Sequence, residues 1–258
     1  MLRKILGMLL ILTLCPALAL CEQPDPDDID PAFLKPEGRL SGIVIGIDAG
    51  HQAHANMDTE PVAPGSKEKK PKVAAGTRGV KSKVAEYIVN LDVSLKLQEA
   101  LEKEGATVIM ARTENDVDIS NIERAQMMNE GGAQLFLRLH CNGVNSKSKN
   151  GIGLYVRKTG GKVADEAYAA AEIILECMVS STGAREDGLF RRDTYSGLNW
   201  AKMPSILVEM GYMTNPEEDL KLNDPEYQNK LVQGMVEGVC RYFETAPEKT
   251  EQAEPDGE

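Results

Sequence analysis

Hydrophobic and polar positions follow two different periods along the middle of the chain. Short apolar runs, typical of buried strands, cover residues 43–47, 106–110, 134–140, 152–156, 189–190 and 205–208. Longer segments with helical spacing of apolar positions cover residues 84–104, 120–130, 163–181 and 226–242. This alternation predicts βαβ units, and therefore a single three-layer α/β/α domain with a largely parallel central sheet of about six strands.

The segment 84–104 is the clearest of the predicted helices. Its apolar positions are expected mostly on one face: Ile88, Leu91, Leu95, Leu97 and Leu101. Gly105 follows it where a helix commonly ends on a glycine. The connection 52–83 before this helix is rich in Gly, Pro and Lys and is long for a compact domain. Such a connection is usually either functional or disordered.

The two ends of the chain differ in composition from the middle. Residues 1–20 have a basic start, an apolar run and the small-residue sequence Ala-Leu-Ala, which together predict a secretory signal peptide. The apolar run is too short to span a bilayer, so we expect no transmembrane helix in the mature chain. The signal peptide therefore predicts export to the cell envelope, either the periplasm or the extracellular wall. Lipoprotein anchoring through Cys21 is the less favoured alternative, because Leu20 stands where that pathway prefers a small residue.

Charge and composition divide the chain into segments and argue against two kinds of feature. Residues 21–40 form an acidic, proline-rich linker, residues 41–244 the folded domain, and residues 245–258 an acidic tail expected to be disordered. The formal net charge of −11 argues against a nucleic-acid partner, because phosphate binding needs clustered Lys and Arg. The few cysteines are far apart, so a disulfide framework is not expected.

Four polar side chains are placed to meet at the carboxyl edge of the predicted sheet. His51 follows the first strand, Glu86 opens the long helix, and His140 and Glu209 end two further strands. Two imidazoles and a carboxylate, with a fourth position for water, are the ligands of a catalytic zinc site, and a second carboxylate can act as a base.

Each of these residues also has a structural interpretation. Glu86 could simply favour the helix N-terminus, and His140 could be a hydrogen-bonded core histidine. Glu209, an acid directly after an apolar strand, requires a partner or an exposed edge. Asp48 is expected to orient the loop or to hydrogen-bond a ligand histidine, since neighbouring carboxylates fix imidazole tautomers. Cys141 should point away from His140 and serve as a small buried residue.

Four longer segments carry a family resemblance. They are IDAGHQ, EYIVNLDVSLKLQEALEKEGATVIMAR, DISNIERAQMMNEGGAQLFLRLHCNG and PSILVEMGYMTNPEEDLKL. In this order and spacing the chain resembles the zinc-dependent N-acetylmuramoyl-L-alanine amidases of the Amidase_3 type, from about residue 43 to residue 243. The long loop and the sequence SGLNWAKMP resemble the version found in spore-forming bacteria, including enzymes of sporulation or germination.

The resemblance implies a function and a set of site residues. By it, His51, Glu86 and His140 are ligands of one Zn²⁺, and Glu209 is the catalytic glutamate. The implied substrate is peptidoglycan, cut at the amide between the lactyl group of N-acetylmuramic acid and L-alanine. Candidate substrate contacts are Asn142, Asn199 and Trp200.

Two alternatives remain beside the amidase. One is a non-catalytic regulatory protein that binds zinc and peptidoglycan, and the other is a zinc peptidase acting within the stem peptide. With any of these functions, an activator protein is a further partner that the sequence leaves open.

Overall fold

The central sheet of the computed structural model, which describes residues 38–245, has six strands in the order β4-β1-β5-β8-β6-β7. All neighbouring pairs are parallel except β6 with β8. The strands are β1 (Val44–Ala49), β4 (Thr107–Met110), β5 (Leu135–Asn142), β6 (Ile152–Val156), β7 (Glu186–Arg191) and β8 (Ser205–Tyr212). The predicted α/β class and largely parallel sheet are confirmed.

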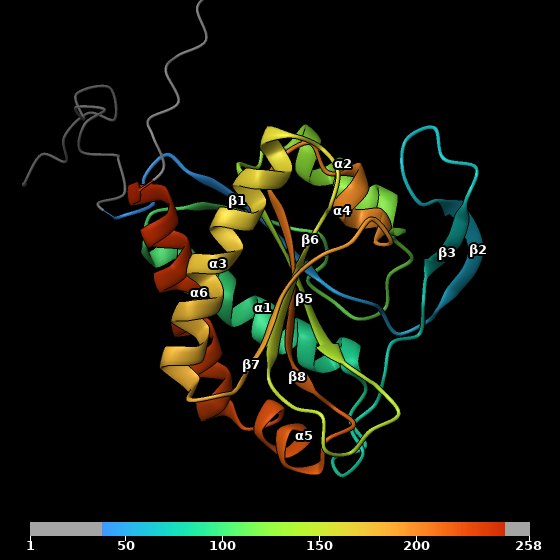
Figure 1. Cartoon of the computed structure of the whole chain (residues 1–258), viewed down its shortest axis with the longest axis vertical. Helices are drawn as coiled ribbons and strands as arrows, with labels where there is room; N and C mark the ends of the chain where they lie inside the picture. The colour runs from blue at the N-terminus through green and yellow to red at the C-terminus, as the bar shows by residue number, and fades with distance from the viewer. Residues whose placement is uncertain (1–37, 246–258) are drawn as a thin grey trace, which may run out of the picture. The chain divides into compact units, whose positions relative to one another are not determined.

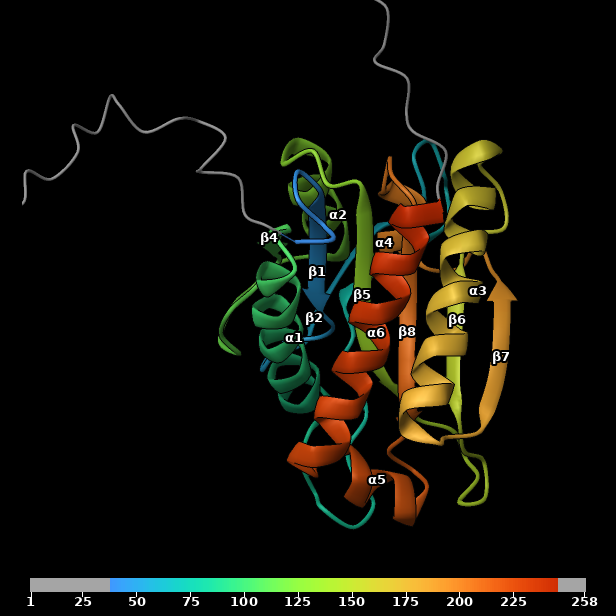
Figure 2. The same cartoon turned by 90° about the vertical axis from the view of Figure 1, so that its left-hand side faces the viewer.

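Helices cover both faces of this sheet. They are α1 (Glu86–Lys103), α2 (Asn121–Glu130), α3 (Lys162–Thr182), α4 (Ser196–Trp200), α5 (Pro216–Leu222) and α6 (Pro225–Thr245). Figure 2 shows α1, α6 and α3 side by side across one face. Figure 1 shows α2 and α4 on the opposite face. The three-layer arrangement is therefore as predicted, although α4 and α5 were not expected from the sequence.

Strand β5 shows how the alternation of side chains builds the two faces. Leu135, Leu137 and Leu139 are fully buried in the larger core, which α1, α3 and α6 share. Phe136 points the other way, into the smaller core beside α2. Continuing the alternation places His140 on the α2 face, whereas Cys141 is buried in the larger core, as expected.

One expectation about α1 is wrong. Leu95 is 39% exposed, because the core face of the helix follows a row of every fourth residue. That row is Val89, Val93, Leu97 and Leu101, all buried. Gly105 follows the cap residue Glu104 with a positive φ of 87°, which confirms its role in ending the helix.

The connection 52–83 is ordered rather than structureless. It contains an antiparallel hairpin of β2 (Asn56–Pro61) and β3 (Lys69–Val73), which lies on the α2 and α4 side of the sheet (Figure 1). Among residues 38–245, none of the helices is both long and apolar enough to cross a membrane. The predicted signal peptide, most of the linker and nearly all of the acidic tail lie outside the described residues.

Candidate metal centre

His51, Glu86 and His140 meet at one point although they come from different elements. The Oε1 atom of Glu86 lies 3.2 Å from Nε2 of His51 and 3.1 Å from Nδ1 of His140. One ligand atom from each residue lies within 4.8 Å of the other two, close enough for all three to hold one metal ion. The convergence predicted from the sequence is therefore present.

The backbone around His51 is built for this approach. His51 has a positive φ of 61°, an uncommon conformation for a residue with a side chain. Its Nδ1 atom is 2.8 Å from the carbonyl oxygen of Ala74, to which it donates. This bond fixes the orientation of the ring, which brings Nε2 to 3.2 Å from Oε1 of Glu86. A Cβ on Gly50 would lie 2.3 Å from the ring of His140, so only glycine allows the loop to pass.

Glu86 is the first residue of α1 and is almost fully buried. Its Oε2 accepts a hydrogen bond from the backbone N–H of Thr77 at 2.8 Å, and its Oε1 accepts one from that of Cys141 at 3.1 Å. Burial alone raises the pKa of the Glu86 carboxyl, but hydrogen bonds from His140 and His51 outweigh it and hold that pKa well below its ordinary value. Glu86 is therefore a carboxylate ready to bind a cation.

The buried atoms that have no hydrogen-bond partner within residues 38–245 include one of His140 and one of Glu209. These two are Nε2 of His140 and Oε2 of Glu209. Buried polar atoms are normally paired, so an unpartnered carboxylate oxygen here indicates a site for a ligand. Burial, and after it the charge of Glu86, raise the pKa of the Glu209 carboxyl well above its ordinary value. Two imidazoles and one carboxylate are the N and O donors that Zn²⁺ takes in three-ligand sites, so the residues present fit that metal.

The group opens into a cavity of about 620 Å³. Its walls come from four side chains, His51, Glu86, His140 and Glu209, and from three segments, residues 73–77 at the end of the hairpin, residues 141–143 and residues 194–196. Asn142, a candidate substrate contact, is among the residues that line it. The long connection after His51 thus supplies one wall of the site.

Asn199 and Trp200 do not line this cavity. The side-chain amide of Asn199 donates to the carbonyl of Val62 at 3.0 Å, and the indole Nε1 of Trp200 donates to the carbonyl of Pro61 at 3.0 Å. Both residues therefore attach the hairpin to α4. The sequence placed them near the substrate, whereas in the structure both line a separate cavity beside Asn129 and Arg157.

Asp48 is a fully buried carboxylate between two arginines. Its Oδ1 lies 2.5 Å from Nη1 of Arg124, and its Oδ2 accepts from Nε of Arg138 at 2.9 Å. Arg124 also donates to the carbonyl of His51 at 3.1 Å. Burial opposes ionisation of Asp48, but Arg124 and Arg138 lower its pKa far below the usual range. Asp48 orients the loop through Arg124, and within residues 38–245 it makes no hydrogen bond to a histidine ring.

Arg112 is a residue of the site that sequence reasoning missed. It is buried, and its guanidinium donates to the carbonyls of Ala49 at 2.7 Å, Gly50 at 3.2 Å and Tyr87 at 2.8 Å. These carbonyls flank His51 and Glu86, so Arg112 ties the two ligand segments together. A lone arginine after a strand gives no signal of this kind, because its partners are backbone atoms.

Comparison with known proteins agrees with this geometry. The LytC N-acetylmuramoyl-L-alanine amidase of Bacillus subtilis is 29% identical over 202 residues, covering 78% of this chain but 36% of the relative. The germination-specific N-acetylmuramoyl-L-alanine amidase of the same organism is 27% identical, covering 79% of this chain and 81% of the relative.

The fold and the family both match. The crystal structure of the amidase Ami1 from Mycobacterium smegmatis superposes with a TM-score of 0.74 at 23% identity, covering 80% of this chain and 99% of that one. The family model described as N-acetylmuramoyl-L-alanine amidase matches residues 45–241, which include all four residues of the centre. The chain therefore belongs to the N-acetylmuramoyl-L-alanine amidase family.

Proposed function

We propose that this protein is a zinc-dependent peptidoglycan hydrolase. It cleaves the amide between the lactyl group of N-acetylmuramic acid and the L-alanine of the stem peptide. The observation that carries the proposal is the position of Glu209, whose carboxylate opens into the same cavity as His51, Glu86 and His140. Three side chains that can hold a metal ion, and a carboxylate in the same cavity that can act as a base, are the groups that metal-assisted amide hydrolysis requires.

Nε2 of His51, a carboxylate oxygen of Glu86 and Nδ1 of His140 would hold the zinc ion. When bound, zinc supplies Lewis-acid polarisation of the amide carbonyl and lowers the pKa of water. The protein keeps the ligands in place through backbone contacts: the Ala74 carbonyl fixes the ring of His51, and the Thr77 amide fixes the carboxylate of Glu86. Such contacts behind the ligands typically contribute about 10- to 100-fold to metal affinity.

Glu209 is the general base and then the general acid. Its carboxylate takes a proton from the attacking water and returns it to the leaving amine of L-alanine, a role worth about 100- to 10,000-fold in rate. Burial, and after it the charge of Glu86, raise the pKa of its carboxyl, which favours the protonated form that serves as the acid in the second step. Its Oε2, buried and without a protein partner among the described residues, is free to hold that proton.

Asn142, which lines the cavity together with His51, Glu86 and His140, binds the substrate. The candidates Asn199 and Trp200 contribute by holding the hairpin that forms one wall. The catalytic domain spans residues 41–244. The predicted signal peptide, linker and tail support action in the cell envelope, during wall remodelling or lysis, with sporulation or germination the narrower setting.

Product identification tests this function. Purified peptidoglycan is incubated with the zinc-loaded protein or with the Glu209→Gln variant, and the products are analysed by mass spectrometry. We expect the wild type alone to release stem peptides with a new free L-alanine amine. Cleavage within the stem peptide would instead identify a zinc peptidase. Zinc binding without any release would indicate the non-catalytic protein or an enzyme that requires an activator.

A further inference from the structure

Strand β3 of the hairpin and the segment that follows it are basic in an otherwise acidic protein. The net charge of the chain is −11, yet residues 67–83 contain seven basic residues and one acidic residue. This segment includes β3 and continues past the cavity to Glu86. Positive charge is therefore concentrated beside the proposed active site, where it acts on an anionic substrate.

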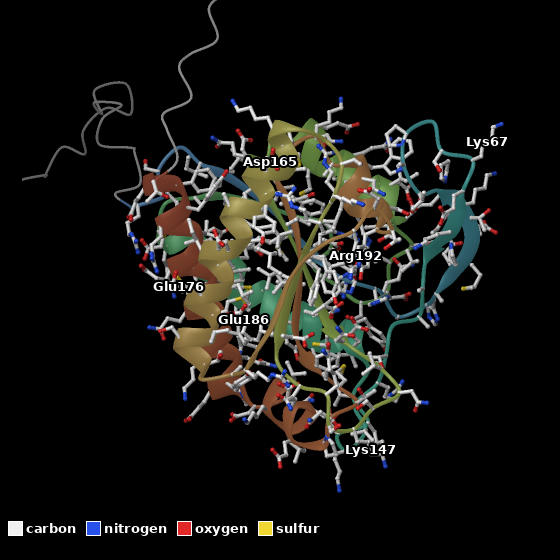
Figure 3. The ribbon with its side chains drawn as sticks, viewed as in Figure 1. Lys67, Lys147, Asp165, Glu176, Glu186 and Arg192 are labelled. Atoms are coloured by element: carbon white, nitrogen blue, oxygen red, sulfur yellow. The ribbon has the colours of Figure 1, made fainter. Side chains whose placement is uncertain are left out.

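Lys70 is the basic residue of this segment that lines the cavity. It is half-buried in β3, and its Nζ donates to the carbonyl of Thr194 at 2.6 Å. That contact links the hairpin to the facing wall and uses one of the three N–H donors of the ammonium. Lys67, by contrast, lies in the turn of the hairpin and extends outward from the molecule (Figure 3).

The other arginine or lysine on the cavity wall is already neutralised. Arg138 pairs with Asp48 and also donates to Asn121 at 2.6 Å. Lys70 pairs with no carboxylate within residues 38–245, the part of the chain that the structure describes. The carboxylates that share the cavity, Glu86 and Glu209, belong to α1 and β8 on other walls. Lys70 thus presents an unneutralised charge and two free donors.

We propose that Lys70 binds a free carboxylate of the stem peptide and makes acidic stem peptides the preferred substrates. The inference rests on the proposed function, because the stem peptide must lie in this cavity when its L-alanine bond is at Glu209. The stem peptide suits such a contact, since it carries free carboxylates on residues that follow the alanine. A charged hydrogen bond of this kind discriminates against a neutral analogue, which leaves the ammonium unpaired.

The test uses two synthetic muropeptides that differ only at the residue after L-alanine, which bears a free carboxylate in one and a carboxamide in the other. We measure kcat and KM of the zinc-loaded wild type, of Lys70→Met, of Lys70→Arg and of the control Lys67→Met. The wild type should have a KM about tenfold lower for the acid than for the amide. Lys70→Met should remove this difference by raising KM for the acid muropeptide alone. Lys70→Arg and Lys67→Met should retain the difference.

Two results would overturn the inference while leaving the proposed function intact. One is an equal KM of the wild type for both muropeptides. The other is an equal rise in KM for both in Lys70→Met, which would mean that Lys70 only holds the hairpin through Thr194. Failure of the proposed function looks different: the wild type would release no free L-alanine amine from either muropeptide, and the inference would fall with it.

Discussion

The imidazole of His51 donates from Nδ1 to the carbonyl oxygen of Ala74, 2.8 Å away, directly after the last residue of strand β3. A proposed metal ligand is thus oriented by the end of the hairpin. The hairpin is in turn held by Asn121, which donates to the carbonyl of Lys72 at 2.5 Å, and by Trp200 through Pro61. The long connection after His51 is therefore part of the support of the metal centre.

A measurement of zinc content should distinguish variants of the metal ligands from a variant of the general base. His51→Ala removes a nitrogen donor from a three-ligand site, so it should lower both zinc content and activity. Glu209→Gln should retain zinc and the fold while losing at least about 100-fold in kcat. Elemental analysis of the dialysed proteins, with circular dichroism as the folding control, checks both. Full zinc occupancy in His51→Ala would count against its assignment as a ligand.

Trp200→Phe should loosen the hairpin without disturbing the zinc site directly. The variant keeps an aromatic ring but leaves the carbonyl of the half-buried Pro61 without its indole donor. We expect a loss of about 1 kcal/mol in the free energy of unfolding and faster hydrogen exchange in residues 56–73. Hydrogen exchange followed by mass spectrometry measures this directly. Unchanged exchange in the hairpin would show that Trp200 does not anchor it.

Asp48→Asn should be strongly destabilising at neutral pH. It leaves Arg124 and Arg138 buried without their carboxylate, a change that typically costs about 3–5 kcal/mol. Denaturant titrations of the two proteins give the difference in unfolding free energy. A loss below about 1 kcal/mol would mean that other acceptors already satisfy both arginines.

The same carboxylate predicts the sign of a pH dependence. The pKa of Asp48 is lower in the folded state than in the unfolded chain, where it is about 3.9. Its stabilising contribution is therefore complete above that unfolded value and is lost as pH falls toward the folded one. The stability gap between wild type and Asp48→Asn should be constant near neutral pH and shrink below about pH 4. A gap that widens with acid would contradict the pairing.

Much of this fold could be predicted from the sequence because its strands are short apolar runs and its helices are periodic. Leu95 was misplaced since the core face follows a four-residue row, which composition alone does not locate. The hairpin was missed because β2 and β3 are polar and lie outside the central sheet.

The candidate site divides in the same way. His51, Glu86 and His140 follow or open regular elements, so their convergence could be expected from sheet topology. Arg112 donates to backbone carbonyls, and Trp200 donates to the carbonyl of Pro61. Residue type and spacing do not predict either contact. The partner of Lys70, the carbonyl of Thr194, is likewise a backbone atom from a distant segment.

The zinc site is tested most directly by the anomalous scattering of zinc in crystals of the zinc-loaded protein, collected on both sides of the zinc absorption edge. We predict one peak per chain about 2 Å from Nε2 of His51, Nδ1 of His140 and a carboxylate oxygen of Glu86, with Glu209 outside the ligand set. A peak at other residues, or one that includes Glu209 as a ligand in place of any of the three, would show that these residues do not form the zinc site.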